Sequence, residues 1–197
     1  GWVVVGHDFC FGYKGEGKAE KLKIYCEERG IGCDIMPPVM LDGRIVSSTY
    51  IRKLIADGDM EKAARYLGHP HTLSDTVHSG YHIGRKLGTP TINMHFPEGV
   101  IIPRHGVYAA KVYLEGGESY VAVTNVGIRP TVANGNSVTV ESHLLDYSGN
   151  LYGRQARVEF YKFLRPEKKF SGFEELSAQI RCDAESAKEY FESADKK

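Results

Sequence analysis

Residues 106–126 read GVYAAKVYLEGGESYVAVTNV, and two runs of strand-forming residues flank the pair Gly116-Gly117. β-branched and aromatic residues favour strands, and a glycine pair between two such runs favours a short hairpin. Runs of the same kind recur further on, and the predicted strands are residues 106–115, 118–126, 138–145 and 155–164. Consecutive antiparallel strands of this length are typical of a small closed β-barrel.

Helical spacing replaces the strand pattern near the C-terminus. Apolar side chains recur there at three- and four-residue intervals, at Phe173, Leu176, Ile180, Ala187, Tyr190 and Phe191. This spacing brings them to one face of a helix. We therefore expect one or two helices to pack across the barrel.

The first 67 residues instead alternate strand and helix, as in an α/β sheet domain. The predicted elements are a strand at 2–5, a helix at 18–29, a strand at 33–36, a helix at 50–55 and a further helix that ends near Tyr66. The first three of these predict a βαβ unit. Because the run at 2–5 is typical of a strand buried in a larger sheet, and no Met precedes it, we expect a further segment before this chain.

A turn-forming Gly68-His69-Pro70 separates the two patterns. It predicts an α/β region at residues 1–67 and a barrel region at residues 68–197.

Composition excludes several classes of function. Lys plus Arg and Asp plus Glu both number 25, so net charge favours neither nucleic acid nor a membrane surface as a partner. No stretch approaches the ~20 apolar residues that span a bilayer. The four cysteines do not show the paired spacing of metal ligands, and we expect them to be reduced thiols. We expect a cytoplasmic protein that acts on small molecules, and the sequence predicts no particular oligomeric state.

A glycine-rich cationic segment precedes the predicted barrel strands. Gly84 and Gly88 permit positive φ angles and a close backbone approach to a ligand, and Arg85 and Lys86 add positive charge beside the amides. Such a loop suits a polyphosphate. Each residue taken singly also fits a plain surface turn that leads into an edge strand.

The next residues add oxygen ligands. Pro90 favours extended geometry, so that Thr91 and Asn93 begin a strand with both side-chain oxygens on one face. Neutral hard oxygens at this spacing can share Mg²⁺ with nucleotide phosphates.

A carboxylate stands in the third predicted barrel strand. Alternation directs Val138 and Val140 to one face and Glu141 with His143 to the other. Glu141 is a candidate general base and His143 a second one, although the pattern alone also fits a solvated outer face.

Six sequence segments in this order resemble motifs of the riboflavin kinase family over about residues 67–190. They are the segments Gly84–Asn93, Gly106–Ala109, Asn125–Thr131, Val140–Asp146 and Leu151–Gly153, followed by Leu164–Glu167. The resemblance implies a Greek-key antiparallel barrel and transfer of the γ-phosphate of ATP to riboflavin, with Mg²⁺, to give FMN.

The resemblance also implies roles for single residues. Glu141 would be the general base, and Thr91 and Asn93 would bind the nucleotide and its Mg²⁺. The other implied ATP-binding residues are Gly80, Gly84, Arg85 and Pro90, and the implied flavin-binding residues are Gly127, Arg129, Thr131 and Arg165. Residues 127–136 would form a mobile loop that closes over the flavin, and Arg165-Pro166-Glu167 fits a helix-entry turn equally well.

Two positions depart from the family pattern. Asp75 stands where Gly is expected, which would alter the turn into the phosphate loop. Ile92 replaces the commoner Ala between Thr91 and Asn93, and its side chain should point away from theirs.

Residues 1–67 resemble the later part of the FMN adenylyltransferase domain of bacterial bifunctional FAD synthetases. The second of two matching motifs contains Ser47, Ser48, Thr49 and Arg52, where hydroxyls at a helix N-terminus and an Arg one turn later could hold a triphosphate. An ordinary helix N-cap is the plainer interpretation. The His-x-Gly-His phosphate motif of such domains is missing, so we expect this chain to retain the kinase reaction alone and the complete polypeptide to make FAD as well.

Two other classes of function compete with a kinase. A flavin- or nucleotide-binding barrel without catalysis would need neither a base nor metal ligands, which argues against it here. A barrel for single-stranded nucleic acid would need interleaved aromatic and basic residues on one sheet face, and the predicted strands do not show them.

Overall fold

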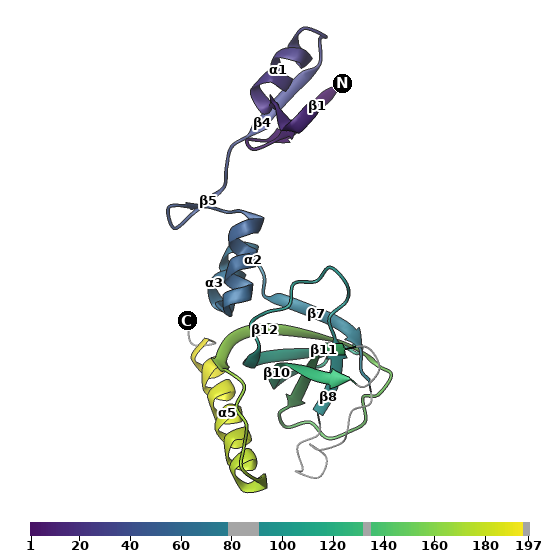
Figure 1. Cartoon of the computed structure of the whole chain (residues 1–197), viewed down its shortest axis with the longest axis vertical. Helices are drawn as coiled ribbons and strands as arrows, with labels where there is room; N and C mark the ends of the chain where they lie inside the picture. Colours follow the sequence, from purple (N-terminus) through teal and green to yellow (C-terminus); the bar gives the residue numbers. More distant parts are fainter. Residues whose placement is uncertain (79–90, 132–134, 195–197) are drawn as a thin grey trace. The chain divides into compact units, whose positions relative to one another are not determined.

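The computed structural model describes residues 1–78, 91–131 and 135–194, with the backbone alone at 129–131 and 135–137 (Figure 1). The chain divides into two compact units, Gly1–Ser47 and Ser48–Lys197, each taken by itself below. The two predicted helices before residue 67 thus belong to the same compact unit as the barrel. The functional boundary at residue 67 stays a prediction.

The first unit is built around a βαβ motif, as predicted. Strands β1 (Trp2–Gly6) and β4 (Gly32–Met36) pair in parallel, and helix α1 (Ala19–Glu27) connects them. The chain leaves α1 through Gly30, whose φ of 66° suits a helix end. The remaining short elements are β2 (Cys10–Phe11), η1 (Tyr13–Gly15), β3 (Gly17–Lys18), β5 (Met40–Leu41) and β6 (Arg44–Ile45).

The second unit begins with two helices, α2 (Ser48–Asp57) and α3 (Met60–Leu67). Asp59 caps α3 by accepting a hydrogen bond from the Lys62 amide at 3.3 Å, and Gly68 ends it in a left-handed conformation. Met60, Ala63 and Tyr66 are buried on α3. This helix contacts β7 and β12 of the sheet that follows.

That sheet is the antiparallel barrel predicted from the sequence. Its strands are β7 (His71–Thr76), β8 (Thr91–His95), β9 (Gly106–Leu114), β10 (Ser119–Thr131), β11 (Gly135–Leu144) and β12 (Gln155–Arg165). Their spatial order is β7-β12-β9-β10-β11-β8, so β12 returns to lie beside β9 after the β9-β10-β11 meander, which is a Greek key. The sheet curls until its two edges meet, where His78 forms a β-bridge with Asn93.

The barrel interior is apolar and tightly closed. Alternate residues of each strand point inward, and the side chains that are almost fully buried include Leu73, Met94, Tyr108, Val112, Val126, Val140, Val158 and Phe160. Two of the interior hydroxyls pair with each other, because Thr124 Oγ1 and Ser142 Oγ lie 2.8 Å apart. The candidate site described below lies on an outer face of the barrel.

One helix, α5 (Phe173–Ala194), covers part of this outer face (Figure 1). It packs on β9 and β10. The contact is a small apolar core made of Val107, Ala109, Val123, Ala187 and Phe191. The helical spacing in the sequence predicted this packing.

Strand β10 is longer than predicted. Residues 127–131, which we expected in a loop, continue the strand and pair with β11 as far as Thr131 and Gly135. Beyond Val126 this part of β10 has no pairing with β9. Pro130 is therefore tolerated, since a strand with a neighbour on one side needs fewer amide donors.

Candidate active site

A row of side chains crosses five strands on the outer face of the barrel. Asn93 of β8 pairs with Glu141 of β11, Glu141 with Asn125 of β10, Asn125 with Val107 of β9, and Val107 with Arg165 of β12. Residues directly opposite each other in a sheet direct their side chains to the same face. Glu141 thus lies between the amide side chains of Asn93 and Asn125.

A second row lies two residues away along the strands and faces the same side. Thr91 pairs with His143, and His143 with Val123. Thr91, Asn93, Glu141 and His143 therefore form a square of polar groups over β8 and β11, as the alternation of the sequence predicted.

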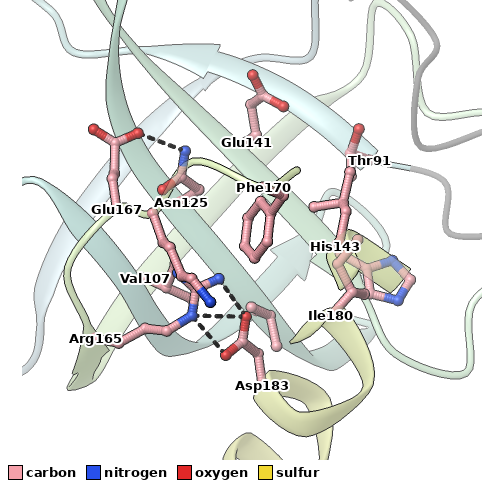
Figure 2. Close-up of a pocket in the computed structure, with 13 residues that line it drawn as sticks. Thr91, Val107, Asn125, Glu141, His143, Arg165, Glu167, Phe170, Ile180 and Asp183 are labelled. Carbon is pink, nitrogen blue, oxygen red and sulfur yellow. Dashed lines mark hydrogen bonds and ion pairs between the residues drawn. The ribbon is translucent and has the colours of Figure 1, made fainter. Parts of the chain in front are cut away.

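Apart from Asn93, these rows form one wall of a pocket of about 250 Å³, and the start of α5 with the segment before it forms the other (Figure 2). Figure 2 shows Phe170 in the centre of the view, with Glu141 above it and Asp183 below. The other lining residues are Thr91, Val107, Val123, Asn125, His143, Arg165, Glu167, Lys168, Leu176 and Ile180. The pocket combines an apolar wall with a polar end.

The polar end fits a hard divalent cation. Asn93 is 7% exposed, and within the residues that the structure describes its buried Oδ1 has no hydrogen-bond partner. A buried carbonyl oxygen left in this state carries a desolvation cost unless a ligand satisfies it. With the Thr91 hydroxyl and the Glu141 carboxylate beside it, the oxygen set is the kind that Mg²⁺ prefers.

Arg165 is fixed at the opposite end by a buried ion pair. Its Nε and one terminal nitrogen donate to the two oxygens of Asp183 at 2.9 and 2.7 Å. Gln179 donates a further hydrogen bond to Asp183 at 2.9 Å. Two parallel bonds of this kind are strong and directional, so Arg165 ties β12 to α5.

Asn125 and Glu167 form a polar contact on the pocket wall. Asn125 Nδ2 donates to Glu167 Oε1 at 3.3 Å. Gly127 makes this possible, because a Cβ at its position would lie 2.3 Å from Glu167 Oε1. Gly127, predicted to contact flavin, therefore shapes the pocket by leaving space for Glu167.

The segment between β12 and α5 is held by Glu175 in the first turn of the helix. Its carboxylate accepts hydrogen bonds from Lys168 Nζ at 2.7 Å and from the Ser171 amide and hydroxyl at 3.0 and 2.8 Å. The Lys168 ammonium and the Ser171 donors lower the pKa of Glu175 to about 2. Lys168 is thereby anchored at the rim of the pocket.

Several lining residues were not predicted from the sequence. Leu176, Ile180 and Asp183 lie on the same face of α5 as Ala187 and Phe191, so the first half of one helical face lines the pocket and the second half packs the core. The apolar spacing in the sequence predicted this helical face, but not its position at the pocket. Asp183 was not predicted, because nothing in the surrounding sequence distinguishes it from the other carboxylates of this charged helix.

Some predicted site residues lie outside the part of the chain that the structure describes in full. Gly80, Gly84, Arg85 and Pro90 lie outside the described residues, and for Arg129 and Thr131 the structure describes only their backbone in β10. Their implied roles stay predictions. Asp75, expected in a turn, instead lies within β7, where it bonds to neighbouring amides.

The predicted triphosphate residues lie at the start of α2. Ser48 and Thr49 are in its first turn, and Arg52 donates to Ser48 Oγ at 3.1 Å. Ser47 belongs to the first compact unit. The Ser48 hydroxyl and the Arg52 guanidinium are thus next to each other, and the triphosphate role of the four residues stays a prediction.

Comparison with known families agrees with this geometry. A family model described as riboflavin kinase matches residues 67–191, which contain the entire barrel and most of α5. The chain belongs to the riboflavin kinase family. A second model, described as FAD synthetase, matches residues 1–50.

Curated relatives of this riboflavin kinase family member are described as bifunctional riboflavin kinase/FMN adenylyltransferases. The protein of Haemophilus influenzae is 39% identical over 98% of this chain and 62% of its own length. Those of Listeria monocytogenes and Escherichia coli K12 are 36% and 38% identical, each over 96% of this chain and 60% of their own length. The chain thus spans about three fifths of these relatives.

A similar solved structure is described as a macrolide-efflux protein from Streptococcus pneumoniae. It superimposes with a TM-score of 0.83 at 31% identity and covers 93% of this chain and 58% of its own. In the described part of the present chain, no helix is both long and apolar enough to cross a membrane.

Proposed function

We propose that this chain transfers the γ-phosphate of ATP to the ribityl 5′-hydroxyl of riboflavin, giving FMN and ADP. The observation that carries the proposal is the position of Glu141, which lies between the half-buried Asn125 and the buried Asn93 and lines a pocket that also has an apolar wall. A carboxylate at this position can accept a hydrogen bond from the hydroxyl of a ligand whose ring system fills the rest of the pocket.

Phosphoryl transfer depends mainly on positioning and on charge neutralisation. Glu141 would orient the ribityl hydroxyl and accept its proton as the oxygen attacks the γ-phosphorus, while ADP leaves. Thr91 and Asn93 would hold Mg²⁺, which neutralises the phosphate charge. The unsatisfied Oδ1 of Asn93 supports this assignment.

The flavin would occupy the apolar part of the pocket. Val107, Val123, Leu176 and Ile180 provide flat aliphatic walls, and Phe170 provides an aromatic face for the isoalloxazine ring. The volume of about 250 Å³ is near the lower end of the ~300–1,000 Å³ typical of ligand pockets. It suits the ring system, with the ribityl chain directed towards Glu141.

We also propose that the complete protein adenylylates FMN to FAD, in the cytoplasm. The match of residues 1–50 to the FAD synthetase model supports this second activity, as does the Ser48–Arg52 contact at the start of α2. The reaction would need parts of the adenylyltransferase site that this chain does not carry, such as the His-x-Gly-His motif. We therefore expect FMN but no FAD from the chain itself.

The test is to incubate the chain with riboflavin, ATP and Mg²⁺ and to resolve the flavins by chromatography, with Glu141→Gln in parallel. General-base catalysis contributes about 10²–10⁴-fold, so we expect kcat to fall by that factor while riboflavin binding persists. Glu115→Gln, on the β9-β10 turn, is the matched control and should retain full activity.

Flavin binding without FMN formation by the parent chain would overturn the kinase proposal. It would favour a non-catalytic flavin-binding module.

A further inference from the structure

A second group of metal-ligating side chains lies at the closure of the barrel. Asp75 of β7, His78 just after it and His95 at the end of β8 each offer one ligand atom, and these three atoms lie within 4.8 Å of one another. Asp75 Oδ2 is 3.2 Å from His78 Nε2 and 3.9 Å from His95 Nδ1. None of its members lines the pocket, although His78 forms a β-bridge with Asn93, one of the predicted Mg²⁺ ligands.

The carboxylate is held in place by backbone donors. Thr76 N–H donates to Asp75 Oδ1 at 2.8 Å, and His95 N–H donates to Oδ2 at 2.8 Å. Hydrogen bonds that orient a ligand from behind are a regular feature of metal sites. The two imidazoles are also close, with ring centroids 4.8 Å apart.

The distances match a transition-metal site after small side-chain rotations. Zn²⁺ binds His nitrogen and carboxylate oxygen at roughly 2.0–2.2 Å, so tetrahedral ligand atoms lie roughly 3.3–3.6 Å apart. The Asp75 to His78 and Asp75 to His95 distances of 3.2 and 3.9 Å are near this value. The side chains of His78 and His95 are 47% and 48% exposed, which leaves an entry path and open coordination positions for water.

We propose that Asp75, His78 and His95 bind one divalent transition-metal ion of the Zn²⁺ or Co²⁺ type. Imidazole ligands favour these ions over Mg²⁺, which prefers oxygen. The ion would link β7 to β8. In the sequence, these strands precede and follow the segment that contains Gly84 and Arg85. Asp75, the departure from the family pattern, is the residue that completes the site.

The experiment uses the chain without a purification tag, treated with EDTA and exchanged into metal-free buffer at near-neutral pH. Co²⁺ is titrated and followed by its visible ligand-field absorption, and Zn²⁺ binding is measured by calorimetry in the presence of excess Mg²⁺. We expect one ion per chain and no thiolate-to-Co²⁺ charge-transfer band. That band would instead indicate binding by cysteines and overturn the proposal.

The variants His78→Gln and His95→Gln should each weaken Zn²⁺ binding by about 10- to 100-fold or more, the range found even for outer-shell partners. His69→Gln is the matched control and should bind as the parent does, because His69 is exposed, hydrogen-bonds to the Pro70 carbonyl and is not a member of the group. Circular dichroism without metal checks that each variant is folded.

If a His variant does not fold, the Zn²⁺ affinity of Asp75→Asn is the deciding measurement. This variant keeps a side-chain oxygen for the backbone amide donors but loses the negative charge, so it should bind Zn²⁺ more weakly than the parent. Equal affinity in the parent and in every folded variant would overturn the proposal, as would the absence of binding by the parent.

Discussion

Glu141 gains its proposed role from its neighbours on the adjacent strands. The carboxylate stands opposite Asn93 on one side and Asn125 on the other. Asn93 leaves a buried oxygen for a cation, and Asn125 is engaged with Glu167 on the pocket wall. One acidic residue is thereby placed between the predicted metal ligands and the predicted flavin pocket.

Gly127→Ala tests how closely the pocket wall is packed. The added Cβ would lie 2.3 Å from Glu167 Oε1, so Glu167 must move and its bond to Asn125 is lost. Because the obstacle is the end of a flexible side chain, we expect the melting temperature to change little. We expect KM for riboflavin to rise about tenfold, the equivalent of roughly 1.4 kcal/mol for one lost polar contact and a shifted wall.

Gly116→Ala is its control, since a Cβ there meets nothing within 4 Å. Steady-state kinetics with varied riboflavin would refute the interpretation if both variants behaved like the parent.

At the scale of elements, α5 serves both the fold and the site. Its second half packs Ala187 and Phe191 against the sheet, and its first half presents Leu176, Ile180 and Asp183 to the pocket. The ion pair between Arg165 and Asp183 joins this helix to β12, with side-chain exposures of 21% and 6%. Movement of α5 would therefore change the pocket directly.

Asp183→Ala should destabilise the protein by about 3 kcal/mol, because it leaves the Arg165 guanidinium without its partner in a mostly buried position. Lys188, also on α5, forms an exposed ion pair with Asp146 in the turn after β11, and Lys188→Ala should cost at most about 1 kcal/mol. Urea unfolding of both variants measures the difference. Similar losses in the two would show that the Arg165 pair contributes no more than a surface pair.

The first turn of α5 should respond to acid through Glu175. Its pKa of about 2 in the folded state lies below the ordinary 4.5, so its stabilising contribution is present above pH 4.5 and is lost as pH falls towards 2. In the parent, we expect the protection factor of the Ser171 amide, which is the exchange rate of an unstructured peptide at the same pH divided by that of the amide, to fall over this range. Glu175→Gln should remove that pH dependence, whereas Glu174→Gln, the preceding residue in the same turn, should leave it unchanged.

For the whole molecule, the compact units and the family match divide the chain at different places. The second compact unit starts at Ser48, and the riboflavin kinase match starts at residue 67. The difference is α2 and α3, and α3 buries Met60, Ala63 and Tyr66 in the unit that contains the barrel. These helices therefore contribute to the stability of the kinase region.

A chain of residues 48–197 should fold and retain the kinase activity of the parent, because it keeps the complete second compact unit. A chain of residues 68–197 lacks the helix that contacts β7 and β12, and we expect a lower melting temperature and loss of activity on storage. Thermal denaturation and FMN formation distinguish the two. Equal stability would show that the helices are dispensable and that residue 67 is the working boundary.

The amino-acid sequence by itself determined the features that depend on local periodicity. The glycine pair predicted the hairpin at Gly116-Gly117, and runs of strand-forming residues predicted β9 to β12, whereas β7 was not predicted. Alternation predicted the shared face of Glu141 and His143, and three- and four-residue spacing predicted the face of α5. The extension of β10 past Gly127 was missed, because Gly, Pro and Asn locally favour a loop and only pairing with β11 outweighs that preference.

Tertiary structure decided which of these residues meet. Strand register places Glu141 between Asn93 and Asn125, the Greek-key return of β12 brings Arg165 to Asp183, and closure of the barrel brings Asp75 to His95. Each contact joins segments that are 16 or more residues apart in the sequence. Periodicity specifies the face on which a side chain lies, but the partner across the sheet follows from packing the apolar interior and pairing every strand, which involves the whole chain at once.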